Sequence, residues 1–441
     1  MKSHDSTRSR VSVLLATGAW TERAIRERLW RHIGRVAPSS QTHLVRNLIA
    51  EFEGWPAPSP FEIARWLGGS SHFEMIAKSI ARRNLRLPVV LASPVFSPSP
   101  PFVDLKIPAI ETSGDLAKWL DVSIAHLDWL ADIRRRHVLA EAPALRHYSY
   151  TVLKKSSGRP RLVEAPKSSL KRVQRKILRD ILDCVPANDR AHGFVKGRSC
   201  LSSASVHGGE TCVMAMDIRN FFHAVTGHRI RMLFRSLGYP YRVADLLTGL
   251  CTTATPVSVF REIPGAGGFE WTERKLRSQP HLAQGAPTSP PLANLCAWRL
   301  DQRLAGLAAR YDANYTRYAD DLAFSGDAGF AKRVRTFQRA VAAIVRDEGF
   351  SIHPDKTRIM QAHMRQTLTG IVVNEHANIA RPEYERLKAI LHNCSRHGAS
   401  GQNREGHGDF RRHLDGRVNW VENVNPARGA KLRALFEEIA W

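Results

Sequence analysis

The chain has 441 residues, of which 65 are Lys or Arg and 41 are Asp or Glu, so its formal net charge is +24. This length allows about two to four domains with a sizeable core, and the positive charge favours a polyanionic partner, with nucleic acid ahead of an anionic membrane surface. No apolar stretch reaches the ~18 residues that span a bilayer. Six scattered cysteines without Cys-x-x-Cys spacing indicate a reducing, cytoplasmic environment and no structural zinc.

The N-terminal part of the chain is predicted to be helical. The first 20 residues join basic residues to a short apolar run, but Asp5 lies in the charged part, so we interpret them as a tail and not a signal peptide. From residue 24 to 84 the apolar residues recur at helical spacing, which predicts an all-helical extension over residues 1–90. Repeated proline and serine over residues 91–108 predict an extended linker.

A strongly basic segment follows. Residues 154–176 contain nine Lys or Arg and one Glu. Its second half has apolar residues at helical spacing, so one face is apolar and the other basic. We expect the basic face to contact a phosphate backbone; an ordinary solvated amphipathic helix is the alternative. The residues predicted to make these contacts are Lys167, Lys171, Arg172 and Arg175.

Three carboxylates stand out further along the chain. Asp217 ends a predicted buried strand, and Asp320 and Asp321 form the tip of a hairpin between strands predicted at 315–318 and 322–325. Taken singly, each acid fits a solvated turn equally well. The order strand, helix, hairpin, helix, strand is typical of a split βαβ layer, a four-stranded antiparallel sheet with both helices on one face. In such a sheet the three acids converge, which suits two Mg²⁺ ions, with Mn²⁺ as a substitute.

These residues resemble the motifs of reverse transcriptases, and within them of the bacterial retron type. DIRNFF from Asp217, QGAPTSP from Gln284 and YADD from Tyr318 are similar to the first three palm motifs, in the same order. HPDKT, residues 353–357, resembles the fourth palm motif, and GRPRLVEAP, residues 158–166, resembles the fingers. Two departures weaken the retron subtype: Ser203 replaces the asparagine of Asn-Ala-x-x-His, and Leu368 replaces the valine of Val-Thr-Gly.

The resemblance implies an α+β, right-hand polymerase fold. We expect fingers over residues 109–210, a split βαβ palm with an antiparallel sheet over 211–374 and a helical thumb over 375–441, after the N-terminal helical extension.

The resemblance also implies roles for individual residues. Asp217, Asp320, Asp321 and the carbonyl of Ile218 would hold the metals, and Lys356 would be the general acid for pyrophosphate. Phe222 matches the aromatic gate that rejects a ribonucleotide 2′-OH. The residues expected to bind the nucleotide are Arg161, Gln284 and Gly285, and those expected to contact nucleic acid include His207, Arg428 and Lys431.

The implied activity is RNA-directed DNA polymerisation from dNTPs. A retron enzyme would copy part of a structured noncoding RNA into cDNA, prime from an RNA 2′-OH, keep the branched RNA–DNA hybrid bound and act with an effector protein in anti-phage defence. The alternatives are a group II intron-like, diversity-generating or abortive-infection reverse transcriptase, an RNA-dependent RNA polymerase, a metal-dependent nuclease and an RNA-binding scaffold.

Overall fold

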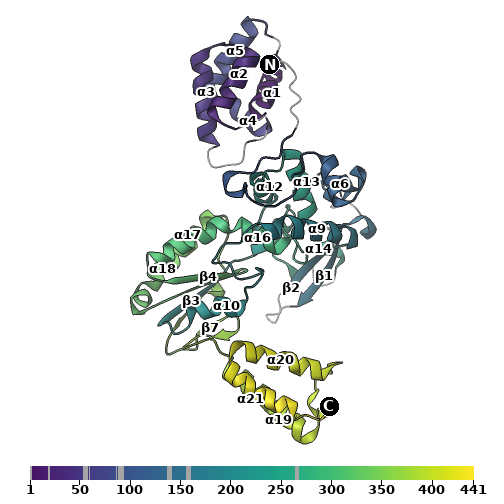
Figure 1. The fold of residues 1–441 in the computed structure, drawn as a ribbon, viewed down its shortest axis with the longest axis vertical. Helices are drawn as coiled ribbons and strands as arrows, with labels where there is room; N and C mark the ends of the chain where they lie inside the picture. The colour runs from purple at the N-terminus through teal and green to yellow at the C-terminus, as the bar shows by residue number, and fades with distance from the viewer. Residues whose placement is uncertain are drawn as a thin grey trace. The chain divides into compact units, whose positions relative to one another are not determined.

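The computed structural model describes residues 2–17, 20–52, 58, 60–85, 87, 94–136, 142–154, 160–263 and 268–441 (Figure 1). The chain forms two compact units. Unit 1 comprises Met1–Val185 and Val225–Ser289, and unit 2 comprises Pro186–Ala224 and Pro290–Trp441. The chain thus enters each unit twice. The boundaries expected for fingers, palm and thumb stay a prediction.

Unit 1 begins with helices. They are α1 (Lys2–Ala16), α2 (Glu22–Ile33), α3 (Pro38–Glu51), α4 (Pro60–Leu67) and α5 (Ser71–Arg82). Val11, Leu14 and Leu15 of α1 are buried in a core shared with α2 to α5. The interpretation of the first 20 residues as a tail is therefore wrong: the short apolar run is the buried side of a helix.

The predicted linker is ordered where the structure describes it. Residues 94–99 have no helix or strand, and the amides of Ser97 and Ser99 donate to the carbonyls of Gly238 and Ser236 at 2.9 Å each. Gly238 has a φ of +104°, and a Cβ there would lie 2.5 Å from the nitrogen of Pro98. The close approach explains why this position is a glycine. Residues 94–99 are thus attached to the end of α12 (Gly227–Ser236), and the linker over residues 91–108 stays a prediction.

The rest of unit 1 surrounds a two-stranded antiparallel sheet of β1 (Tyr148–Lys154) and β2 (Pro160–Pro166). Leu162 of β2 packs with Val259, Phe260 and Phe269 in a small core. The other helices of this unit are α6 (Ser113–Leu120), α7 (Ile124–Ala131), α9 (Ser168–Asp180), α13 (Tyr241–Cys251), α14 (Val259–Glu262) and α15 (Trp271–Arg277). The predicted basic amphipathic helix is α9, whose Leu170, Val173 and Ile177 are buried.

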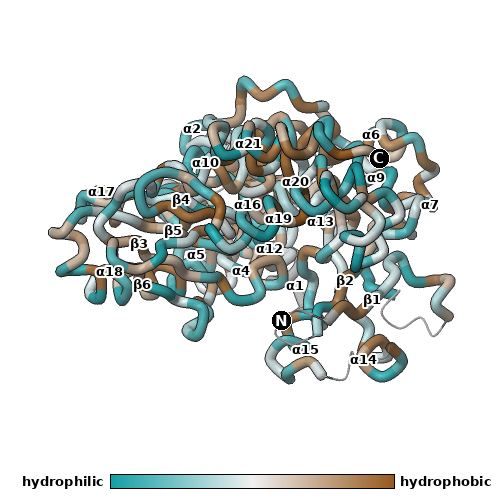
Figure 2. Tube along the Cα trace, turned by 90° about the horizontal axis from the view of Figure 1, so that it is seen from below, coloured by the Kyte–Doolittle hydropathy of each residue, from teal (hydrophilic) through white to brown (hydrophobic). Residues whose placement is uncertain are grey.

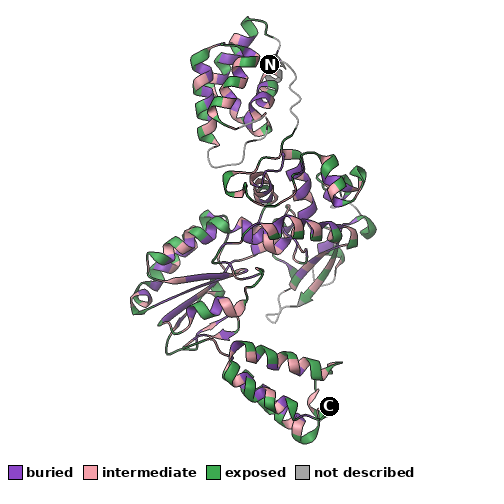
Figure 3. Ribbon diagram, viewed as in Figure 1, coloured by how far each residue is buried: buried purple, intermediate pink, exposed green. Residues whose placement is uncertain are grey.

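Unit 2 contains the predicted four-stranded antiparallel sheet. Its strands are β3 (Cys212–Asp217), β4 (Asn314–Tyr318), β5 (Asp321–Gly326) and β6 (Arg358–Gln361), in the order β4-β5-β3-β6. All three neighbouring pairs are antiparallel. Two helices, α17 (Trp298–Ala309) and α18 (Ala328–Asp347), pack on the sheet, and Figure 3 shows the strands as largely buried. Another helix, α16 (Ser289–Cys296), directly precedes α17 and is separated from it by Ala297.

The end of unit 2 is helical, with α19 (Arg381–His397), α20 (Phe410–Val424) and α21 (Pro426–Glu437). Its core joins apolar residues of these helices to Val213 of β3 and Met360 of β6. In the chain, a small hairpin lies between β6 and α19. It consists of β7 (Thr367–Leu368) and β8 (Ile371–Val372), and its turn residues Thr369 and Gly370 both have positive φ, as a type I′ turn requires. Figure 2 shows apolar and polar residues alternating along the helices. Within the described part of the chain, no helix is long and apolar enough to cross a membrane.

Candidate active site

The three predicted acids meet at one end of the four-stranded sheet. Asp217, the last residue of β3, is the register partner of Asp321, the first residue of β5. Directly opposite residues in an antiparallel pair have Cα atoms about 4.5 to 5.5 Å apart. Asp320 precedes Asp321 in the turn, and all three line one concavity of unit 2 together with Lys356 and Arg358.

Backbone hydrogen bonds fix this arrangement. The amide of Ile218 donates to the carbonyl of Asp320 at 2.8 Å, and the amide of His353 donates to the carbonyl of Asp217 at 2.8 Å. The first bond ties the β4–β5 turn to the end of β3, and the second ties the segment before η6 (Pro354–Lys356) to the same place. Ile218 therefore positions the turn through its amide, and its carbonyl remains the proposed extra metal ligand.

The acids repel one another. Asp217 is 7% exposed, whereas the side chain of Asp321 still reaches solvent at the rim of the concavity. Partial desolvation, together with the charges of Asp320 and Asp217, raises the pKa of Asp321 to about 6, against the opposing effect of Lys356 and Arg358. A carboxyl group in such surroundings is more easily ionised when a divalent cation is bound, so this donor set fits a hard cation such as Mg²⁺.

Lys356 lies against the acids. Its ammonium donates to Oδ2 of Asp217 at 2.6 Å, and its side chain is 54% exposed. The structure thus brings the predicted general acid to the metal-ligating candidates, although residues 217 and 356 are far apart in the sequence. The positive charge of this ammonium partly neutralises Asp217.

Phe222 lies in the segment that follows Asp217 at the end of β3. It belongs to α11 (Phe221–Ala224), and its ring centroid lies 5.8 Å from that of Phe221 and 6.0 Å from that of Phe194. Phe222 is only partly buried, and Phe194 is 51% exposed. An aromatic ring that still reaches the surface is available to contact a ligand, as a nucleotide gate requires.

The predicted nucleotide-binding residues other than Phe222 belong to unit 1. Arg161 is an exposed residue of β2. The loop of Gln284 and Gly285 is attached to the same strand, because the amide of Glu164 donates to the carbonyl of Gln284 at 2.9 Å. Gly285 has a φ of +139°, and a Cβ there would lie 2.9 Å from the carbonyl oxygen of Glu164. Unit 1 therefore attaches the Gln284–Gly285 loop to the strand that also carries Arg161.

Comparison with known proteins supports the resemblance to reverse transcriptases. The family model described as reverse transcriptase (RNA-dependent DNA polymerase) matches residues 152–376. The retron Mx65 reverse transcriptase of Myxococcus xanthus is 39% identical over 329 residues, which cover 74% of this chain and 71% of that protein. This chain belongs to the retron-type reverse transcriptases.

Two further relatives agree. The retron Mx162 reverse transcriptase of M. xanthus is 34% identical over 345 residues, covering 75% of this chain and 67% of that protein. The retron Ec86 reverse transcriptase of Escherichia coli is 30% identical over 291 residues, covering 66% and 80%. The chain is therefore an RNA-directed DNA polymerase with the polymerase fold, and it belongs to a divalent-metal-dependent family.

The reverse transcriptase has a buried carboxylate that the sequence did not single out. Glu164 of β2 is fully buried and accepts hydrogen bonds from Thr255 Oγ1 at 2.6 Å and His281 Nε2 at 2.9 Å. Arg277 Nη1 lies 3.5 Å from Oε2 of Glu164, the oxygen that His281 also contacts. Burial alone would raise the pKa of Glu164, but His281, Arg277 and Thr255 together lower it. These partners follow Glu164 by about a hundred residues, so no local pattern could have predicted them.

The prediction that His207 contacts RNA is wrong for this structure. The ring is fully buried, with Nδ1 2.8 Å from Ser325 Oγ and Nε2 2.8 Å from Thr316 Oγ1. Burial lowers the pKa of His207 to about 3, helped by the charge of His192. A neutral ring with both nitrogens bonded to β4 and β5 supports the four-stranded sheet from within and cannot reach a nucleic acid.

The predicted nucleic-acid contacts on α9 face solvent to different degrees. Arg172 and Arg175 are exposed, and Lys171 is partly exposed. Lys167 donates to the carbonyls of Pro143 at 2.7 Å and Ala144 at 3.1 Å, so two of its three protons are engaged. A basic groove of unit 1 is lined by Lys171, Arg172 and Arg175 of α9 together with Trp119 of α6.

The two predicted contacts near the end of the chain also differ. Lys431 is exposed. Arg428 is partly buried: its guanidinium donates to Asn378 Oδ1 at 3.2 Å and lies over the ring of Tyr384. Lys431 is thus the more accessible cation on α21.

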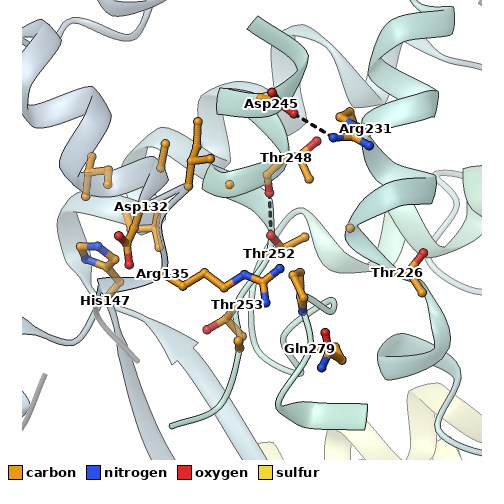
Figure 4. Close-up of a pocket in the computed structure, with 18 of the residues that line it drawn as sticks. Asp132, Arg135, His147, Thr226, Arg231, Asp245, Thr248, Thr252, Thr253 and Gln279 are labelled. Carbon is orange, nitrogen blue, oxygen red and sulfur yellow. Dashed lines mark hydrogen bonds and ion pairs between the residues drawn. The ribbon is translucent and has the colours of Figure 1, made fainter. Parts of the chain in front are cut away.

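Unit 1 also has a separate cavity between α7, β1, α12 and α13 (Figure 4). Arg231 and Asp245 form an ion pair of 3.4 Å on one wall, and the Thr252 hydroxyl donates to the Thr248 carbonyl at 2.8 Å. Figure 4 shows Arg135 extending toward Thr253. None of the three acids lines this cavity.

Proposed function

We propose that this reverse transcriptase copies part of a structured noncoding RNA into DNA by two-metal nucleotidyl transfer at Asp217, Asp320 and Asp321. The observation that carries the proposal is the convergence of the three acids at the end of the sheet, where Asp217 and Asp321 are register partners. We propose that β3 to β6 with α17 and α18 form the palm, α9 and the β1–β2 hairpin belong to the fingers, and α19 to α21 form the thumb.

The three carboxylates and the Ile218 carbonyl would hold two Mg²⁺ ions, with Mn²⁺ as a substitute. Bound there, the ions would activate the attacking hydroxyl and neutralise the leaving pyrophosphate. The crowding that raises the pKa of Asp321 supports this assignment, because a cation relieves it.

The chain's own residues would orient the substrates. Arg161 has the planar guanidinium that suits bidentate contact with a triphosphate, and the Gln284–Gly285 loop attached to the same strand would line the dNTP pocket. Lys356, held at Asp217, would deliver a proton to the departing pyrophosphate.

Phe222 would select dNTPs by clashing with a 2′-OH. Replacing Phe222 with Ala is expected to raise incorporation of rNTPs relative to dNTPs by roughly 10- to 100-fold, the scale of steric discrimination in a pocket. The measurement is primer extension with each nucleotide set. Phe194→Ala, which removes the neighbouring exposed ring, is the matched control, and an unchanged rNTP to dNTP ratio in Phe222→Ala would assign Phe222 to packing.

The partners follow from the resemblance to retron enzymes. We propose that the enzyme primes from a 2′-OH of its RNA, keeps the branched RNA–DNA product bound and acts with an effector protein in anti-phage defence. The exposed Arg172, Arg175 and Lys431 are the proposed contacts to the RNA backbone.

The proposal is tested with purified protein, Mg²⁺, dNTPs and a primed RNA template. We expect cDNA from the parent and none from Asp320→Asn. Absence of cDNA from the parent, or an active Asp320→Asn variant, would overturn the proposed mechanism. Degradation of the RNA without dNTPs would favour a nuclease. Sequencing the nucleic acid that copurifies with the protein tests the retron product, because covalently branched cDNA is expected.

A further inference from the structure

A buried arginine lies directly behind the turn that carries two of the three acids. Arg317 of β4 is fully buried, and its guanidinium forms a bidentate pair with Asp301 of α17, with Nε to Oδ1 at 2.8 Å and Nη2 to Oδ2 at 2.6 Å. Asp301 is also fully buried and accepts the Tyr315 hydroxyl at 2.8 Å. The charges are thus paired in the fork geometry that suits a guanidinium and a carboxylate.

The remaining donor group of Arg317 points at the turn. Its Nη1 donates to the carbonyl of Ala319 at 3.1 Å and to Oδ1 of Asn294 at 2.8 Å. The Nδ2 of Asn294 in turn donates to the carbonyl of Gly193 at 2.8 Å. The guanidinium therefore joins α16, α17 and the residue that immediately precedes Asp320.

Ala319 needs such support. It has a φ of +56°, a left-handed conformation that costs a non-glycine residue energy and persists only where its surroundings enforce it. The backbone of Gly193 also packs closely on Ala319, since a Cβ at Gly193 would lie 2.4 Å from the Ala319 nitrogen. The turn thus contacts both the Gly193 backbone and the Arg317 guanidinium.

The same guanidinium contacts the segment after Asp217. Its Cζ lies 5.4 Å from the ring centroid of Phe221, whose neighbour is the proposed gate Phe222. One side chain therefore touches both segments that leave the ends of β3 and β4 at the site.

We infer that Arg317, fixed by Asp301, is a positioning residue that holds Ala319 in its left-handed conformation and so sets the places of Asp320 and Asp321. The inference rests on the proposed role of these acids as metal ligands. Arg317 itself touches neither substrate nor metal. A lysine would keep the positive charge but lose the fork, so it could not hold Asp301 and Ala319 at once.

The first test is Arg317→Lys in the primer-extension assay with the full chain. We expect kcat to fall by roughly 10- to 100-fold with little change in KM for dNTP, because a displacement of about 1 Å at reacting groups has an effect of this size. The Mg²⁺ concentration for half-maximal activity is expected to rise. Arg303→Lys, on the helix α17 that carries Asp301, is the matched control and should keep the parent's kcat, because its guanidinium pairs with Glu348 and Asp347 near the surface.

The second test is a rescue that a merely structural role would not produce. Glycine adopts a positive φ without strain, so Ala319→Gly combined with Arg317→Lys should recover several-fold of the lost kcat, while Ala319→Gly alone should change kcat little. A folded Arg317→Lys variant with the parent's kcat and Mg²⁺ requirement, or a loss that Ala319→Gly does not relieve, would overturn the inference.

Asp320→Asn in the same assay separates the two proposals. If the Asp320→Asn variant is active, the proposal that Asp320 binds the metal is wrong, and the inference about Arg317 fails with it. An inactive Asp320→Asn beside a fully active Arg317→Lys would overturn only the role of Arg317.

Discussion

Glu164 in unit 1 and Asp321 in unit 2 are both strand carboxylates, yet their surroundings act on them in opposite directions. Glu164 is fully buried, and its pKa is lowered because His281, Arg277 and Thr255 more than offset the cost of burial. Asp321 reaches solvent, and its pKa is raised to about 6 because partial desolvation is joined by two neighbouring acids. Desolvation raises the pKa of both carboxyl groups, and the charges of their neighbours decide whether that rise is reversed, as at Glu164, or reinforced, as at Asp321.

The largest effect that would test this contrast is expected for Asp321→Asn. Removing a proposed metal ligand should lower cDNA synthesis by about 10³-fold or more, since metal stabilisation of the transition state is worth several kcal/mol. The melting temperature of the metal-free protein should nevertheless rise at pH 8, because one of three repelling charges is gone. Primer extension and a thermal melt in chelator measure the two effects. A fall in both would mean that Asp321 supports the fold.

Glu164→Gln should give the reverse pattern. The change leaves Arg277 and His281 buried without their carboxylate, and breaking a buried ion pair in this way costs about 3 to 5 kcal/mol. We expect the unfolding midpoint in urea to fall, with Glu262→Gln, the half-exposed partner of Arg146, as the milder control. An unchanged midpoint would show that the network does not stabilise unit 1.

A smaller effect concerns pH. Because the pKa of Asp321 is raised in the folded chain, protonation of this group favours the folded state, and its contribution is lost as pH rises through about 6. The pKa of Glu164 is lowered, so its contribution is present above the ordinary glutamate value and lost as pH falls below it.

Proton and metal should therefore compete at Asp321. We expect Mn²⁺ affinity without nucleotide, measured by electron paramagnetic resonance, to weaken by roughly tenfold per pH unit below about 6. Asp321→Asn should lose this dependence. An affinity that stays constant between pH 5 and 7 in the parent would contradict the prediction.

The smallest effect is expected at Asp355, which lines the same concavity but has an 81% exposed side chain. Solvent screens such a charge, so Asp355→Asn should change kcat and the Mg²⁺ requirement by less than about twofold. A loss comparable to that of Asp321→Asn would extend the proposed metal site to η6.

The sequence predicted the parts of the site that follow from strand order. Asp217 and Asp321 belong to adjacent strands of a sheet that short apolar runs and a turn between them indicate, and β3 to β6 have the expected antiparallel arrangement. The same reasoning failed where a side chain's partners are distant in sequence. His207 was assigned to RNA, but it bonds to hydroxyls more than a hundred residues away.

Arg317 and Asp301 were missed for a related reason. An arginine beside an acidic turn suggests a ligand contact, and only the packing of α17 on β4 shows that its charge is neutralised inside the unit. The position of Arg317 in the strand was the signal that could have revealed its burial. Tyr315 and Arg317 are two residues apart in β4, so their side chains point to the same face of the sheet, and the arginine therefore lies on a face that packs in the interior.

The attachment of residues 94–99 to α12 has a practical consequence for dissecting the enzyme. A shortened protein designed to lack α1 to α5 should begin close to residue 94, because Ser97 and Ser99 bond to Gly238 and Ser236 and the Phe96 ring packs 5.3 Å from that of Tyr239. Starting at residue 109 would uncover those carbonyls and an aromatic surface. Aggregation of the shorter version would then reflect a poorly chosen cut and say nothing about what the first five helices do.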